Sequence, residues 1–134
     1  MGDKVVHEGG CHCRRVRWRV TAAADLIAWD CNCSVCAMKR NVHFIVPAAD
    51  FELVSGADDL VEYRFLTNVA RHLFCGRCGV QSYYHPRSNP DGVGITVACV
   101  DEGTISSVEV RHFDGVHWEE SYEATKIASQ SKSV

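Results

Sequence analysis

Seven of the eight cysteines in this chain lie in three tight clusters, and thiolates are the side chains that suit zinc best. A disulfide framework distributes its cysteines and needs an oxidising compartment, whereas a metal site needs thiolates that converge on one point. The spacing therefore predicts metal sites rather than disulfides. The clusters are Cys11-His-Cys13, Cys31-Asn-Cys33-Ser-Val-Cys36 and Cys75-Gly-Arg-Cys78, and Cys99 stands alone.

The number of thiolates predicts one complete metal site and one incomplete site. Cys75-Gly-Arg-Cys78 has the spacing of a zinc knuckle, in which two thiolates on a tight turn need two further ligands. Cys11 and Cys13 can supply such a pair, because residues two apart on a strand share a face. Seven thiolates then leave a second site with three ligands, and a vacant position is typical of catalytic zinc. Spacing alone leaves the pairing of the clusters open.

Four other residues compete for the vacant position. Cys99 is in phase with the apolar residues of the stretch 93–97, so we interpret it as a core residue of a strand, although a fourth thiolate would close the second site. His12 lies between two cysteines and is expected to point to the opposite face. His43 and His85 are candidates for lining a site, but a polar role in a strand or loop is favoured for both.

The elements that carry these clusters are predicted to be mainly β-strands. Val16, Trp18 and Val20 alternate with arginines, which is the period of a half-buried strand. Helix is predicted only as a turn after Cys33 and another at residues 48–51. Further short strands are predicted near residues 27–29, 44–46, 61–65, 73–74, 93–99 and 108–110.

Composition and charge exclude several classes of protein. The net charge of −3 gives no general attraction to nucleic acid or anionic membranes, and no apolar run is long enough to cross a bilayer. The first residues lack the features of a signal peptide, so we expect a protein of the cytoplasm or the nucleus that is not secreted. No linker or repeat divides the chain. Residues 1–123 are expected to form a single zinc-binding domain, followed by a flexible tail at 124–134.

Three motifs together resemble those of the glutathione-dependent formaldehyde-activating enzyme family, and the resemblance runs from Gly9 to Trp118. It implies an Mss4-like β-tent of small antiparallel sheets with zinc sites and little helix. The motifs are Gly10-Cys11-His12-Cys13, Cys31-Asn32-Cys33-Ser34-Val35-Cys36 and Phe74-Cys75-Gly76-Arg77-Cys78-Gly79. Stretches similar to the centromere protein V branch of the family include His43-Phe44-Ile45-Val46-Pro47 and Pro86-Arg87-Ser88-Asn89-Pro90.

The resemblance also implies an activity and two Zn²⁺ ions per chain. Glutathione, or a similar small thiol, would bind through its sulfur at the open zinc. The protein would then form or cleave an S-hydroxymethyl adduct with formaldehyde, as a carbon–sulfur lyase. The implied ligands are Cys11, Cys13, Cys75 and Cys78 for a structural zinc, and Cys31, Cys33 and Cys36 for the open one. Candidates for holding the carboxylates of glutathione are Lys39, Arg40 and Arg87, for which a solvated surface role is equally open.

The competing hypothesis is a non-catalytic, zinc-stabilised interaction module of the centromere protein V type. The one basic cluster of the chain includes Arg15, Arg17 and Arg19, which alternate along a predicted strand. Outward arginines on a strand are more often a solvated or edge-protecting face than a nucleic-acid surface. We therefore expect a small-molecule thiol as partner rather than nucleic acid or a membrane, and leave the oligomeric state open.

Overall fold

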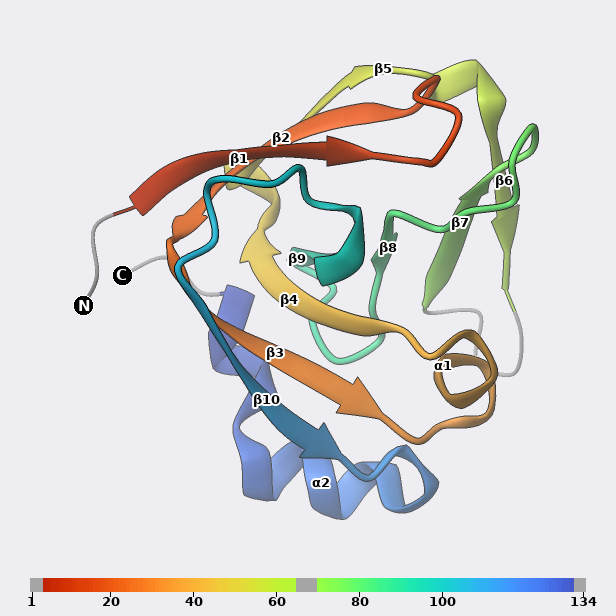
Figure 1. The fold of residues 1–134 in the computed structure, drawn as a ribbon. Helices are drawn as coiled ribbons and strands as arrows, with labels where there is room; N and C mark the ends of the chain where they lie inside the picture. Colours follow the sequence, from red (N-terminus) through yellow and green to blue (C-terminus); the bar gives the residue numbers. More distant parts are fainter. Residues whose placement is uncertain (1–3, 65–69, 132–134) are drawn as a thin grey trace.

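The structure is a computed structural model that describes residues 4–64 and 70–131, and two β-sheets form its body (Figure 1). The strands are β1 Lys4–Gly10, β2 Arg17–Ala23, β3 Asp25–Cys31, β4 Val42–Pro47, β5 Phe51–Ser55, β6 Leu60–Tyr63, β7 Arg71–Cys75, β8 Tyr83–His85, β9 Gly92–Thr96 and β10 Ser107–Phe113. The helices are α1 Ser34–Lys39 and α2 Trp118–Thr125, with 3-10 turns η1 Ala48–Asp50, η2 Ala57–Asp59, η3 Val97–Cys99, η4 Gly115–His117 and η5 Ile127–Ser131.

The mainly β fold class predicted from the sequence is confirmed. The smaller sheet has the strand order β1-β2-β5, and the larger sheet has the order β10-β3-β4-β9-β8-β7-β6. Neighbouring strands are antiparallel except for β10, which runs parallel to β3, so the larger sheet is mixed rather than purely antiparallel.

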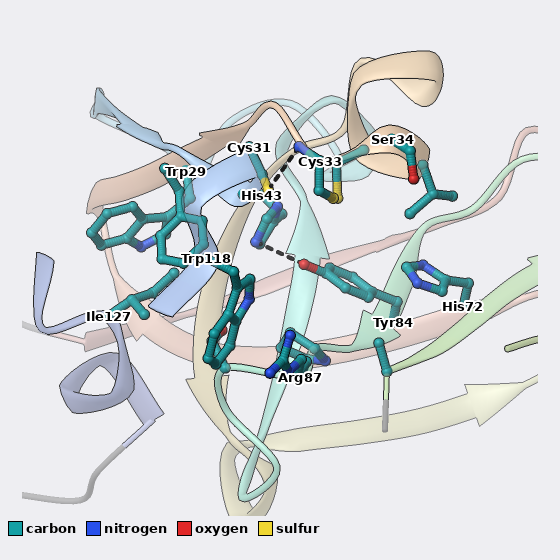
Figure 2. Close-up of a pocket in the computed structure, with 17 residues that line it drawn as sticks. Trp29, Cys31, Cys33, Ser34, His43, His72, Tyr84, Arg87, Trp118 and Ile127 are labelled. Atoms are coloured by element: carbon teal, nitrogen blue, oxygen red, sulfur yellow. Dashed lines mark hydrogen bonds between the residues drawn. The ribbon is translucent and has the colours of Figure 1, made fainter. Parts of the chain in front are cut away.

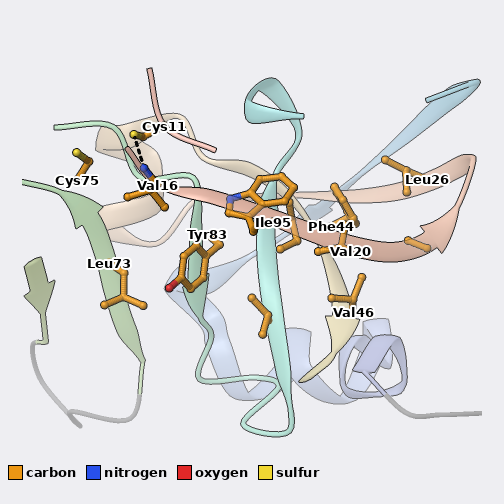
Figure 3. Packing of buried hydrophobic residues seen from close by; sticks show 13 residues of the cluster. Cys11, Val16, Val20, Leu26, Phe44, Val46, Leu73, Cys75, Tyr83 and Ile95 are labelled. Atoms are coloured by element: carbon orange, nitrogen blue, oxygen red, sulfur yellow. Dashed lines mark hydrogen bonds between the residues drawn. The ribbon is translucent and has the colours of Figure 1, made fainter. Parts of the chain in front are cut away.

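The larger sheet is covered on both faces, which explains why β4 is apolar along most of its length. On one face, Phe44 and Val46 pack in the main core with residues of β2 and β9 (Figure 3). On the other face, Ile45 joins a second core with Trp29, and side chains of α2 and η5 belong to the same cluster. β4 therefore separates two cores, and the second of them contains thiols of the cluster Cys31–Cys36.

The alternation predicted for β2 is also observed. Trp18 and Val20 are buried, whereas Arg19 is exposed between its cross-strand neighbours Glu8 and Glu52, with nitrogen–oxygen distances of 3.5 Å to each. Arg17 pairs with Asp101. The arginine face of this strand is thus matched by acidic side chains.

Two predictions about the chain differ from the structure, and one helix has no counterpart among the predictions. Cys99 lies in η3 rather than in a strand, because β9 ends at Thr96. Helix α2 was not predicted, since only Trp118 and Tyr122 give it an apolar stripe. The expected tail from residue 124 is packed through Ser131, and residues 132–134 lie outside the described residues.

Asn89 holds this last segment in place. Its side chain is fully buried, and its Nδ2 lies 3.1 Å from the carbonyl oxygen of Ile127, 3.2 Å from that of Ala128 and 2.8 Å from Ser131 Oγ. Its Oδ1 accepts a hydrogen bond from Ser88. One buried amide therefore satisfies several polar groups of η5, which would otherwise be buried without partners.

We expect Asn89→Ala to lower the free energy of unfolding by about 2–3 kcal/mol, because it leaves buried carbonyl groups unsatisfied. Urea unfolding of the zinc-loaded protein measures this change. The control is Asn32→Ala, which removes an exposed 2.9 Å hydrogen bond to Asp114 and should cost less than about 1 kcal/mol. Equal losses in the two variants would contradict the packed position of η5.

Candidate metal centres and their cavity

The first thiol cluster forms where β1 and β7 end. The sulfur atoms of Cys11, Cys13, Cys75 and Cys78 all lie within 4.8 Å of one another. The Cys11–Cys13 distance is 3.6 Å and the Cys13–Cys75 distance is 3.7 Å. Four thiolates at about 2.3 Å from a tetrahedral zinc ion would be separated by about 3.8 Å, so the arrangement fits zinc.

The local backbone explains how two distant segments reach this point. After β1 the chain turns so tightly that a Cβ on Gly10 would lie 1.9 Å from the carbonyl oxygen of Val16, so only glycine fits. The knuckle turn closes with a 2.7 Å hydrogen bond from the Gly79 N–H to the Cys75 carbonyl, and Gly79 has a φ of 78°. The backbone N–H of Arg77 also donates a hydrogen bond to the sulfur atom of Cys75, at a nitrogen–sulfur distance of 3.3 Å.

The second cluster forms at the junction of β3 and α1. The sulfur atoms of Cys31, Cys33 and Cys36 also lie within 4.8 Å of one another. Cys31 ends β3, Cys33 is the N-cap of α1, and Cys36 is buried on that helix. Gly115 packs so closely that a Cβ there would lie 2.9 Å from Cys31 Sγ, and this contact closes one side of the cluster.

The three thiols of the second cluster hydrogen-bond to one another and alter one another's pKa values. Hydrogen bonds from Cys31 and Cys36 lower the pKa of Cys33 to about 2. The pKa of Cys31 is raised to about 11, first because its thiol hydrogen-bonds to Cys33, and that of Cys36 is raised for the same kind of reason. Zn²⁺ would replace the protons that these thiols share, because only the thiolate form of cysteine is a metal ligand.

The second cluster opens into a cavity of about 230 Å³ (Figure 2). The three thiols form part of its wall. Aromatic side chains from β3, β8, β10 and the start of α2 form much of the remainder, including Trp29 and Trp118. Of the histidine, cysteine and carboxylate side chains in the described residues, none completes the cluster as a fourth metal ligand.

His43 and Tyr84 form a buried polar pair in this cavity. Tyr84 Oη lies 3.0 Å from His43 Nε2, and the Nδ1 of the histidine lies 3.3 Å from the carbonyl oxygen of Asn41. Because a carbonyl only accepts, we assign the proton to Nδ1 and the tyrosine hydroxyl as the donor to Nε2. Burial lowers the pKa of His43 to about 4 and raises that of Tyr84, so both side chains are neutral at pH 7.

The other candidates from the sequence lie in different places. His12, His85 and Cys99 belong to neither thiol cluster. Cys99 is partly buried against the main core, and burial raises the pKa of its thiol to about 11. His43 lines the cavity, as one alternative held, although as a neighbour of the thiols rather than as a member of their cluster.

The three candidate cations are separated by the structure. Arg87 lines the thiol cavity, where its guanidinium stacks at 3.7 Å from the Trp118 ring centroid and lies 3.1 Å from Glu119. Lys39 and Arg40 instead line a second, more open groove at the far end of α1. Of the three cations, the cavity brings only Arg87 together with the second thiol cluster, and its aromatic wall was missed by sequence reasoning.

Comparison with known proteins agrees with this arrangement of thiols. The family model described as glutathione-dependent formaldehyde-activating enzyme matches residues 6–114. The chain belongs to this family. A protein of Rhodobacter sphaeroides, solved by a structural genomics programme, is 30% identical with a TM-score of 0.66, over 78% of this chain and 99% of the other. Among the described residues, no helix has both the length and the apolarity needed to span a membrane.

Cys78→Ser should abolish cooperative unfolding at ordinary temperature, because folding and binding of a structural zinc are coupled. Cys99→Ala is the matched control, since its thiol is partly buried but lies outside both clusters. It should cost only about 1 kcal/mol and leave the metal content unchanged. Thermal unfolding and metal analysis by mass spectrometry measure both effects. A stable Cys78→Ser variant with full metal content would contradict the closed site.

Proposed function

We propose that this chain is a zinc-dependent carbon–sulfur lyase of the formaldehyde-activating type. Glutathione or a similar thiol binds at an open zinc held by Cys31, Cys33 and Cys36, and the protein forms or cleaves its S-hydroxymethyl adduct. The observation that carries this proposal is the convergence of three thiols, with no fourth ligand among the described side chains, on the wall of a cavity. The other zinc, held by the first cluster of Cys11, Cys13, Cys75 and Cys78, is structural.

Zinc at the open site would hold the incoming thiol as its thiolate. In the forward direction, a sulfur–carbon bond forms as the carbonyl double bond opens, and the oxygen takes up the proton that the thiol has released. Aromatic side chains line much of the cavity in which this step would take place. The hydroxyl of Tyr84, oriented by His43, lies on the same cavity and can hydrogen-bond the hydroxyl of the adduct.

Assignment to the centromere protein V-like branch, and to a single zinc-binding domain, remains part of the proposal. The interaction-module alternative receives less support from the structure. Arg17 and Arg19 face acidic partners on neighbouring strands and in the loop at Asp101, so this basic face is largely neutralised. Salt-sensitive binding to nucleic acid or to a protein partner, independent of any thiol, would favour that alternative.

Glutathione should bind the zinc-loaded protein, whereas S-methylglutathione should bind at least about tenfold more weakly, because it cannot form a thiolate. Binding should release a proton and strengthen as the pH rises towards about 8.5, the pKa of an ordinary cysteine thiol. Calorimetry at two pH values in buffers of different ionisation enthalpy measures both the affinity and the proton release.

Cys33→Ala should abolish this thiol binding and reduce the bound zinc to one equivalent, while the protein still unfolds cooperatively because the other cluster is separate. Cys99→Ala serves as control and should bind glutathione normally. Equal affinity for glutathione and its S-methyl derivative would contradict a sulfur–zinc contact.

A further inference from the structure

Strand β10 leaves one edge of the larger sheet open. It is the outermost strand in the order β10-β3-β4-β9-β8-β7-β6 and, among the described strands, it is paired only with β3 (Figure 1). Six consecutive residues, 107–112, are exposed, so side chains on both faces of the strand reach solvent. A strand in this position presents a row of backbone N–H and C=O groups that can pair with another strand.

The other outer strands have shorter or partly used edges. β5 has five residues and β6 has four, whereas β10 has seven. β1 also has seven, but Gly9 forms a bridge with Val100, and the Glu8 carbonyl accepts a 2.8 Å hydrogen bond from the Asp101 N–H. Within the described residues, β10 is therefore the longest edge without such a contact.

The charges of β10 complement one another when two copies run antiparallel with Val110 opposite Val110. In this register, Glu109 of each copy lies opposite Arg111 of the other, so the two strands form two pairs of opposite charge. Opposite charges directly across two strands stabilise the pairing, whereas like charges destabilise it. The remaining cross-strand pairs bring no like charges together: Val108 with His112 and Ser107 with Phe113.

Other symmetric registers lack this match. Residues that lie opposite each other share a face of the sheet, so a two-fold axis between the strands must pass at a residue. An axis at Glu109 or at Arg111 would place that residue opposite its own copy and bring like charges together. An axis at Val108 or His112 would leave both charged residues opposite uncharged ones. The charges therefore favour an axis at Val110.

The smaller sheet already contains this kind of charge matching. Arg19 on β2 lies between Glu8 on β1 and Glu52 on β5, with nitrogen–oxygen distances of 3.5 Å to each. Within one chain, Arg111 Nε lies 2.5 Å from a carboxylate oxygen of Glu109, and both side chains remain exposed. A guanidinium has five N–H donors, so Arg111 can keep this contact and also bind the carboxylate of a second copy.

The opposite face of β10 contributes an apolar contact. Val108 and Val110 are 38% and 47% exposed, and they alternate with the charged residues along the strand. An axis at Val110 places the two copies of this valine against each other, which removes apolar surface from water. Charge on one face and apolar contact on the other thus favour the same register.

We propose that β10 pairs antiparallel with β10 of a second copy of this chain, around a two-fold axis at Val110. The larger sheets of the two copies then form one continuous sheet, with Glu109 and Arg111 of both copies at its centre. The same surface is used on both sides, so the assembly closes as a dimer. One pair of seven-residue strands is a small interface, so the dissociation constant is on the order of 10 µM.

Sedimentation velocity of the zinc-loaded protein, up to about 500 µM, measures this dissociation constant. Glu109→Arg and Arg111→Glu should each raise it at least about tenfold, because each substitution turns both cross-strand pairs into like charges. Both substitutions in one chain restore opposite charges and should restore the dimer. Glu52→Arg is the matched control, because it makes the same charge change beside an arginine on another outer strand, and it should leave the dissociation constant unchanged.

An equimolar mixture of the two single variants tests the register directly. Neither variant should pair with itself, but in a mixed dimer the chain with two positive charges lies opposite the chain with two negative charges. The mixed dimer should therefore form at least as tightly as the dimer of the unsubstituted protein, and native mass spectrometry distinguishes it by mass from either homodimer. The proposal is overturned if the unsubstituted protein stays monomeric at about 500 µM, if the single variants dimerise as it does, or if their mixture stays monomeric. None of these measurements involves a thiol substrate, so their outcome is independent of the proposed function.

Discussion

The meeting of Cys11 and Cys13 with Cys75 and Cys78 is the contact on which the arrangement of the two sheets depends. It joins the end of β1 in the smaller sheet to the end of β7 in the larger one, across more than sixty residues of chain. Four thiolates within 4.8 Å of one another would repel, so a cation such as Zn²⁺ would stabilise this contact. The Val80 N–H lowers the pKa of Cys78 to about 6, which prepares that thiol to bind a cation.

Zinc bound by the first cluster would fix the two sheets independently of the second cluster. Its thiols come from one continuous stretch, Cys31–Cys36, which turns directly from β3 into α1, so their proximity is local. This stretch packs in the second core with α2 and η5, while the first cluster borders the main core. Because β4 separates the two cores, a ligand can reach the open cluster without disturbing the contact that holds the sheets together.

The sequence predicted the features whose signals are local. The alternation at Trp18 and Val20 predicted β2. The spacing of the cysteines predicted the zinc knuckle and a second cluster with only three thiols. The pairing of Cys11 and Cys13 with the knuckle cysteines came from the family resemblance, because the spacing within each motif carries no information about distant partners. Cys99 was placed in a strand because its apolar period continues past Thr96, where the backbone in fact turns into η3.

The cavity could not be predicted, because its walls come from elements far apart in the chain. Trp29 gives no signal beyond its position before Cys31, and Trp118 lies in a helix whose two aromatic residues are too few to establish a period. The packing of η5 depends on the single side chain of Asn89, in a loop that the sequence marks only as a turn. Such features follow from tertiary contacts rather than from local periodicity.

The electrostatics of the second cluster bear on how catalysis would work there. Three thiolates around a divalent zinc leave a net negative charge, so the metal would be a mild Lewis acid and the bound thiolate a weaker nucleophile than a free one. His43 and Tyr84 are neutral neighbours, and Arg87 is paired with Glu119, so the described side chains around the cavity add little compensating charge. Activation by charge would therefore be small, and the gain would lie in holding sulfur and carbonyl carbon together beside the aromatic wall of the cavity.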